Sequence, residues 1–325
     1  MRLIKSITIK PASVLNNTVS KCNYGSIFYY LQRLRLCAVA DLKHKTLNIE
    51  RMMIVEQMLN NAPKPLLHIA DVSGSALFNA DCMDILPLIP DKSVQLILAD
   101  LPYGTTANKW DSIIPLEPLW EEYKRIIKDN GAIVLFGAEP FSTMLRYSNI
   151  EWYKYDWIWV KSRKTGFLNS KNRPLNQNEN ISVFSKSITA AGNSNIMLYN
   201  PQGLITINKK RHGDKNKCDA DFNGHKYYRK SQSKEYLQEF TNYPTTILSF
   251  ANEPKPIHPT QKPLELMKYL ISTYSNENDM VLDNTMGVGT TCLGAKELNR
   301  SFIGIEKEVK YYELAVGRVF GQHCH

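Results

Sequence analysis

Residues 94–104 read VQLILADLPYG, an apolar run that leads into a polar, proline-containing end. The run over residues 94–99 is short and is bounded by prolines on both sides, which predicts a buried β-strand. Asp100 and Tyr103 therefore stand where a central strand ends and a loop begins. Open α/β sheets bind their ligands at this end of the strands. A carboxylate and an aromatic ring at this place predict a site for a flat, hydrogen-bonding ligand such as a nucleobase.

A second stretch, residues 281–291, reads VLDNTMGVGTT. It predicts a strand, a glycine-rich turn and the start of a helix, in that order. Gly287 and Gly289 allow the backbone to turn tightly and to approach a ligand closely. No lysine follows these glycines, which argues against a triphosphate-binding loop. Glu306, at the end of the next predicted strand, is an acid of the kind that accepts hydrogen bonds from ribose hydroxyls.

Together, the two stretches resemble the DNA amino-methyltransferases, which carry a D-P-P-Y-like catalytic loop and a D-P-F-x-G-S-G-T-like loop for S-adenosyl-L-methionine (AdoMet). Residues 258–263, HPTQKP, match the motif that precedes the AdoMet strand in this family. The catalytic loop comes first along the chain, as in the permuted β group. The resemblance covers residues 77–320. It implies an α/β fold, the Rossmann-like doubly wound sheet of AdoMet-dependent methyltransferases, circularly permuted and with an inserted target-recognition region.

Alternating strand and helix patterns along the chain agree with this topology. Strands are predicted over residues 76–81, 94–99, 131–137, 153–160, 180–184, 281–283 and 302–306, and helices over residues 83–88, 116–128, 140–148, 264–275, 290–298 and 309–320. The strands at 153–160 and 180–184 are expected to be antiparallel neighbours at one edge. A permuted sheet also needs a strand beside residues 302–306, and residues 77–81 are expected to supply it.

This reading divides the chain into five parts. We expect a basic N-terminal extension of unknown role (1–70), the catalytic half of the methyltransferase domain (71–185), a target-recognition insertion (186–257), the AdoMet-binding half (258–320) and a tail (321–325). The first 40 residues contain six Lys or Arg and no Asp or Glu, a composition typical of a transit peptide. The alternative is an extension of the chain, with the core beginning near Met52 or Met53.

The resemblance assigns the methyl transfer to Asp100, Pro102 and Tyr103. An exocyclic amine is a poor nucleophile because its lone pair is delocalised into the base. Hydrogen-bond acceptors at its N–H groups localise that pair, and Asp100 and the backbone carbonyl of Leu101 offer two. Pro102 stiffens the loop, and Tyr103 is expected to stack on the flipped base. Transfer then depends on positioning and electrostatics and requires no metal. Leu101 departs from the first proline of the family's loop, as Asn284-Thr285 does from the Pro-Phe of the AdoMet loop.

The resemblance also implies a set of cofactor contacts. Glu306 is expected to bind the ribose, Asp81 the adenine ring, and Asp283 to lie near the methionine end. Thr260 and Lys262 are expected to hold the methionine carboxylate. The complete predicted AdoMet-binding set is Asp81, Thr260, Lys262, Asp283, Gly287, Gly289, Thr290 and Glu306.

Residues 186–256 carry 11 Lys or Arg and six Asp or Glu, a net charge of +5. Cations interleaved with aromatic rings can neutralise phosphates and stack on bases. Together with Arg173 from the polar loop at 161–179, which resembles a loop that flanks the target base in this family, the predicted DNA-binding residues are Arg173, Lys209, Lys210, Arg211, Arg229 and Lys230. The alternative for both segments is a solvated surface without a ligand.

The composition of the chain limits the partners, the cysteine chemistry and the location that can be expected for the protein. The 325 residues are 43% hydrophobic and carry a formal net charge of +9, which fits a polyanionic partner. Six cysteines without a C-x-x-C pair argue against a zinc knuckle and a disulfide framework. No apolar run approaches the ~18 residues of a membrane span. We therefore expect a cytoplasmic protein of prokaryotic or phage origin, monomeric or dimeric, that acts on double-stranded DNA, with a cognate restriction endonuclease as an optional partner.

The favoured function is methylation of adenine N6 in DNA, since the adenine enzymes of the family mostly carry Asp at the place of Asp100. Cytosine N4 stays open as the acceptor, because both amines present two N–H donors. A catalytically inactive DNA-binding relative is a further alternative. An RNA or protein-glutamine methyltransferase is disfavoured by the order of the motifs. A nucleotide-cofactor oxidoreductase is disfavoured by the incomplete G-x-G-x-x-G.

Overall fold

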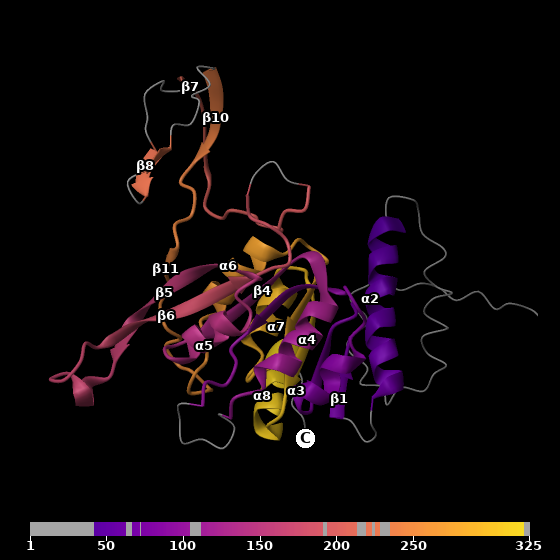
Figure 1. Ribbon diagram of the computed structural model, residues 1–325. Helices are drawn as coiled ribbons and strands as arrows, with labels where there is room; N and C mark the ends of the chain where they lie inside the picture. The colour runs from indigo at the N-terminus through magenta and orange to yellow at the C-terminus, as the bar shows by residue number, and fades with distance from the viewer. Residues whose placement is uncertain are drawn as a thin grey trace, which may run out of the picture.

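A nine-stranded sheet runs through the computed structural model, which describes residues 42–62, 67–71, 73–104, 112–190, 194–212, 219–222, 225–227 and 235–321 (Figure 1). In spatial order, its strands are β1 (Leu67–Ala70), β2 (Ala76–Asn79), β13 (Ser301–Glu306), β12 (Met280–Asp283), β3 (Val94–Ala99), β4 (Ile127–Gly137), β6 (Asn176–Phe184), β5 (Tyr153–Thr165) and β11 (Ile247–Ser249). Neighbours from β2 to β4 are parallel. Strands β1 and β6 run antiparallel to their neighbours.

The central strands follow from their sequences. Every residue of β3 and of β12 is buried, and in β13 only Glu306 is not fully buried. Parallel strands with helices on both faces require such continuous apolar runs. For this reason the apolar run at 94–99 predicts β3 with both of its boundaries correct.

The circular permutation is confirmed by strand pairing. Strand β13 pairs in parallel with β2, and Glu306 lies opposite Asn79. The side-chain amide of Asn79 donates to the backbone carbonyl of Glu306 at 2.8 Å. An early strand of the chain therefore completes the sheet beside the last one, as the sequence predicted.

Helices cover the two faces of the sheet (Figure 1). The helices α6 (Leu264–Tyr274), α7 (Thr290–Glu297) and α8 (Val309–Phe320) contribute to one apolar core. The helices α2 (Leu42–Asn61), α3 (Cys82–Ile85), α4 (Leu116–Ile126) and α5 (Phe141–Ser148), with the short 3₁₀ turn η3 (Leu86–Leu88), contribute to the second core. The molecule is therefore a three-layer α/β structure. Among the described residues, no helix combines the length and apolarity that a membrane crossing requires.

Part of the expected N-terminal extension belongs to this second core. In α2, Val55 and Met58 are buried. Arg51 donates to the hydroxyl of Ser301 in β13 at 2.8 Å. Helix α2 thus packs on the body of the molecule. The basic segment 1–41 and the residues 322–325 of the tail lie outside the described residues.

The loop predicted over residues 161–179 is shorter than expected. Strand β5 continues to Thr165 and β6 begins at Asn176, and the connection contains the 3₁₀ turn η4 (Phe167–Asn169). The two strands are antiparallel, as predicted, but the edge of the sheet is formed by β11, which pairs with β5. Cross-strand pairing outweighs the polar composition of this segment, and it places Lys161 and Glu179 within strands.

The insertion contains a two-stranded ribbon that projects away from the body of the molecule (Figure 1). The ribbon consists of β7 (Ile205–His212) and β10 (Glu235–Thr241), which are antiparallel. A second short pair consists of β8 (Asp219–Phe222) and β9 (His225–Tyr227). This segment shows only weak periodicity in the sequence, yet it forms two short antiparallel pairs of its own. The β7–β10 pair lies away from the main sheet.

Candidate active site

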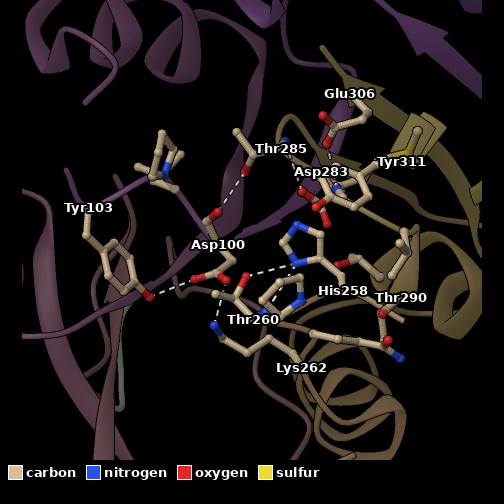
Figure 2. A pocket seen from close by; sticks show the side chains of 18 of the residues that line it. Asp100, Tyr103, His258, Thr260, Lys262, Asp283, Thr285, Thr290, Glu306 and Tyr311 are labelled. Atoms are coloured by element: carbon tan, nitrogen blue, oxygen red, sulfur yellow. Dashed lines mark hydrogen bonds and ion pairs between the residues drawn. The ribbon is translucent and has the colours of Figure 1, made fainter. Parts of the chain in front are cut away.

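One cavity of about 530 Å³ lies where the carboxyl ends of four parallel strands meet. Asp81 follows β2 and Asp100 follows β3, while Asp283 and Glu306 are the last residues of β12 and β13. All four line the cavity, although the chain separates the first from the last by more than half its length. The predicted convergence at the carboxyl edge of the sheet is thus present (Figure 2).

At one end of the cavity, Asp100 is held by three contacts (Figure 2). The Tyr103 hydroxyl donates to Oδ1 at 2.6 Å and the Lys262 ammonium to Oδ2 at 2.6 Å. The hydroxyl of Thr285 donates to the backbone carbonyl of Asp100 at 3.0 Å. Burial raises the pKa of Asp100 above its ordinary value, and the charge of Lys262 opposes this shift. Leu101, in place of the family's proline, is itself buried.

Glu179 is a site residue that the sequence analysis missed. Its side chain is 6% exposed and lies 2.6 Å from Lys161 and 2.9 Å from Lys262. The Tyr103 hydroxyl also lies 2.9 Å from Glu179. Burial alone would raise the pKa of Glu179, but Lys262 and Lys161 together lower it to about 2. The residue was assigned to a polar loop, and only strand alternation over 176–184 could have placed it on the inward face.

Tyr103 is fixed from two sides. Its ring stacks on Phe141 of α5, with the centroids 5.1 Å apart and the planes at 27°. Its hydroxyl reaches Asp100 and Glu179. Tyr103 and Pro102 both line the cavity, beside Asp100. The three predicted catalytic residues are therefore together at one end of the cavity.

Two acids with raised pKa values line the cavity at the ends of β12 and β13. Asp283 accepts from the backbone N–H of Thr285 at 3.1 Å, and burial raises its pKa to about 7. Glu306 accepts from the backbone N–H groups of Gly287 at 2.9 Å and Glu308 at 2.8 Å. Burial raises the pKa of Glu306 to about 7 as well, although these two hydrogen bonds act to lower it. A ligand that donates N–H or O–H hydrogen bonds to these two carboxylates would therefore stabilise their ionised forms.

The two glycines of the turn differ in their surroundings. Gly287 has φ +52°, and a Cβ there would meet no protein atom within 4 Å, because the position borders the cavity. Gly289 has φ +72°, and a Cβ there would come within 3.0 Å of Ala315 in α8. Gly287 therefore leaves room for a ligand, whereas Gly289 allows close packing of α8.

The remaining predicted cofactor residues are placed as follows. Asp81 caps α3 by accepting from the backbone N–H of Met83, and it pairs with Lys307 at 2.9 Å. Thr260 contacts His258 Nδ1 through its hydroxyl at 3.1 Å. Thr290 accepts from Arg318 at 3.2 Å. Lys262, predicted for the methionine carboxylate, contacts Asp100 and Glu179 at the catalytic end.

His258 and Tyr311 were not singled out by the sequence analysis as side chains of the site. Their rings meet edge to face with centroids 4.3 Å apart, and both line the cavity near Asp283 and Glu306 (Figure 2). Burial and the charge of Lys262 lower the pKa of His258 to about 4. A neutral imidazole and an aromatic ring thus border the cofactor end of the cavity.

The predicted DNA-binding residues are separate from this cavity. Lys209, Lys210 and Arg211 are exposed on β7 of the ribbon, and Arg173 is exposed in the β5–β6 connection. Arg229 and Lys230 lie outside the described residues. Within the described part of the chain, no cluster of three His, Cys, Asp or Glu is arranged to hold a metal ion.

Comparison with known proteins identifies the family of the chain. The family model described as DNA methylase, N6_N4_Mtase, matches residues 94–317. The Type II methyltransferase M.HinfI of Haemophilus influenzae is 27% identical over 271 residues, which span 75% of this chain and 68% of that protein. The Type II methyltransferase M1.MboII of Moraxella bovis is 28% identical over 262 residues, 72% of this chain and 92% of that protein.

The fold is also that of a solved structure. The PvuII DNA methyltransferase (cytosine-N4-specific) aligns with a TM-score of 0.54 at 15% identity, over 75% of this chain and 86% of that one. Fold and site define an AdoMet-dependent methyltransferase. The chain belongs to the N6/N4 DNA methylase family. Membership of this family excludes the alternative classes of RNA methyltransferase, protein-glutamine methyltransferase and nucleotide-cofactor oxidoreductase.

The described residues fit the family's cofactor. A volume of about 530 Å³ is within the range of small-molecule sites. The open space at Gly287 admits close approach of a ligand to the backbone. Glu306 and Asp283 supply acceptors for hydroxyl and ammonium donors. The predicted cofactor, AdoMet, is therefore confirmed at the level of the family, while its individual contacts stay predictions.

Proposed function

We propose that this DNA methyltransferase transfers the methyl group of AdoMet to N6 of adenine in double-stranded DNA, as the modification enzyme of a restriction–modification pair. The names of its Type II relatives support the second part. The observation that carries the first part is a partly buried carboxylate, Asp100, directly after a strand and in the same cavity as Asp283 and Glu306. Cytosine N4 is the second candidate acceptor, because both amines present two N–H donors to such a carboxylate.

Asp100 and Leu101 are the proposed acceptors for the target amine. Asp100 takes one N–H of the exocyclic amine and the backbone carbonyl of Leu101 the other, which directs the nitrogen lone pair toward the methyl group. Pro102 restricts the backbone between them and Tyr103. The Tyr103 ring, backed by Phe141, offers a platform for the flipped base. These contacts act by positioning the nucleophile and by electrostatic complementarity.

The part of the cavity lined by Asp283 and Glu306 is the proposed AdoMet site. AdoMet supplies an electrophilic methyl group bound to a positively charged sulfur. Glu306 accepts from the ribose hydroxyls and Asp81 contacts the adenine ring, while Asp283 lies toward the methionine end. Thr260, Lys262, Thr290 and the glycine turn complete the proposed set, in which Gly287 provides the close backbone approach.

The ribbon is the proposed DNA contact, together with Arg173. Residues opposite one another in an antiparallel pair share a face. Lys209 faces Gln238 and Arg211 faces Tyr236 on one side of the ribbon, whereas Lys210 lies opposite Leu237 on the other. The first side unites two cations, an amide and an aromatic ring. Such groups bind phosphates and base edges, and a two-stranded ribbon fits the major groove.

The decisive experiment is digestion of DNA methylated by the protein to nucleosides, followed by mass analysis. N6-methyl-2′-deoxyadenosine is the expected product. N4-methyl-2′-deoxycytidine alone would refute the adenine assignment and keep the class of enzyme. Absence of both from DNA incubated with AdoMet would indicate a catalytically inactive relative.

Asp100→Ala tests the mechanism. It should reduce methyl transfer by at least about a thousandfold, because it removes an acceptor at the amine and nothing from the cofactor. AdoMet binding, measured by calorimetry, should remain within about twofold of the unaltered protein. Full activity in this variant would contradict the assigned role of Asp100.

A further inference from the structure

Five side chains form one network around the buried Glu179 and Lys262 at the catalytic end of the cavity: Asp100, Tyr103, Lys161, Glu179 and Lys262 (the Lys262 network). Lys262 is 8% exposed and bridges Asp100 and Glu179 at 2.6 and 2.9 Å. Lys161 neutralises the other oxygen of Glu179 at 2.6 Å. Two carboxylates and two ammonium groups thus balance in charge, which makes their burial feasible.

Tyr103 has one hydroxyl proton and two acceptors within reach. Oδ1 of Asp100 lies at 2.6 Å and Oε1 of Glu179 at 2.9 Å. A single O–H group donates one full hydrogen bond, so it is shared or directed to one of the two. The second oxygen of Asp100 is bound by Lys262. Both oxygens of Asp100 therefore already accept from the protein before a target amine arrives (Figure 2).

Oδ1 of Asp100 thus already accepts one hydrogen bond, and it becomes a stronger acceptor for the target amine when Tyr103 turns its hydroxyl away. The phenol can release this oxygen by rotating its O–H bond, because Glu179 is already at hydrogen-bond distance. The Tyr103 ring then stays stacked on Phe141. Since Glu179 is ionised at neutral pH, with its pKa lowered by the two lysines, it is a strong acceptor for this proton.

We propose that Glu179 is a positioning residue for methyl transfer, which holds Lys262 against Asp100 and accepts the Tyr103 hydroxyl when the target amine takes its place. This inference rests on the proposed function of Asp100. The inference goes beyond that proposed function, because it assigns a role to a side chain in β6, outside the catalytic loop and the AdoMet loop.

The charges around Asp100 make the proposal measurable. Lys262 lowers the pKa of Asp100, the Tyr103 hydrogen bond lowers it further, and Glu179 raises it by repulsion. Asp283, at the end of the neighbouring strand β12, interacts with Asp100 in the same repulsive sense. Removing the charge of Glu179 should therefore lower the pKa of Asp100, whereas removing the Tyr103 hydroxyl should raise it.

The first test is Glu179→Gln in the full chain, which keeps shape and removes charge. We expect the single-turnover rate of DNA methylation at saturating AdoMet to fall at least tenfold. The acidic limb of the pH–rate profile should move to lower pH. AdoMet affinity at each pH serves as the control and should remain within twofold. An unchanged rate, or an acidic limb that does not move, would overturn the proposal.

The second test is Tyr103→Phe, which retains the ring on Phe141. Here the acidic limb should move to higher pH, opposite to the shift in Glu179→Gln. A shift in the same direction in both variants, or none in this one, would overturn the proposal. If the Glu179→Gln protein does not bind AdoMet, its rate cannot be interpreted. The direction in which the acidic limb of the pH–rate profile moves in Tyr103→Phe then decides whether the proposal holds. If the unaltered protein methylates no DNA, the proposed function fails instead.

Discussion

Gly287 is the residue at which the backbone is open to a ligand. Replacement by Val should weaken AdoMet binding at least tenfold, because its side chain would enter the cavity. Part of any effect will come from strain, since positive φ costs a non-glycine residue roughly 1–2 kcal/mol. Gly203, with φ +76° in the insertion, is a matched control for that strain. Calorimetric titration of both variants with AdoMet measures the difference, and equal affinities would contradict the assigned loop.

At the scale of the element, the ribbon offers a comparison of its two faces. Lys209→Ala and Arg211→Ala should each weaken DNA binding and reduce the slope of log K against log salt by about one, since one phosphate contact is lost. Lys210→Ala, on the opposite face, should change both far less. Anisotropy titrations at several salt concentrations test this. A larger loss in Lys210→Ala would place the DNA on the other face.

Helix α2 offers a second test at this scale. Met58 is fully buried against the core, while Met53 on the same helix is 61% exposed. Met58→Ala should lower the free energy of unfolding by roughly 2–5 kcal/mol through loss of packing. Met53→Ala should change it by less than about 0.5 kcal/mol. Urea denaturation followed by circular dichroism distinguishes the two. Equal, small effects would mean that α2 is an appendage and not part of the fold.

For the whole molecule, Asp283 and Glu306 couple folding to pH. Their pKa values in the folded state are about 7, above the ordinary values near 4 in an unfolded chain. Between these values the folded state binds more protons than the unfolded state. Stability without cofactor should therefore fall as pH rises from about 4 to about 7. Thermal melts across this range measure the trend.

AdoMet binding should have the opposite dependence on pH from the stability of the cofactor-free protein. Its hydroxyl and ammonium donors favour the ionised carboxylates, so binding should release protons and become tighter as pH rises through 7. Calorimetry in two buffers with different ionisation enthalpies counts the protons. Glu306→Gln should abolish part of the release, whereas pH-independent affinity in the unaltered protein would contradict the coupling.

The sequence alone predicted the central strands of the sheet and the acids at its carboxyl edge. Strands β3, β12 and β13 are buried on both faces, so each must be a continuous apolar run that can be recognised locally. The residue that ends such a strand then lies at the binding edge by topology alone. Asp100 and Glu306 could be placed in one site for this reason, and the family resemblance supplied the permuted order.

Only the tertiary structure decided which charged side chains surround Asp100. Lys262 lies 162 positions further along the chain and Glu179 comes from β6, a strand whose polar sequence resembles a loop. The strand forms because β4 and β5 pair with it on both sides, and that information is not local. The sequence predicts where a carboxylate must be, since strand ends follow from burial. Its counter-charge depends on which distant cation is buried beside it, and this is a property of the packed molecule.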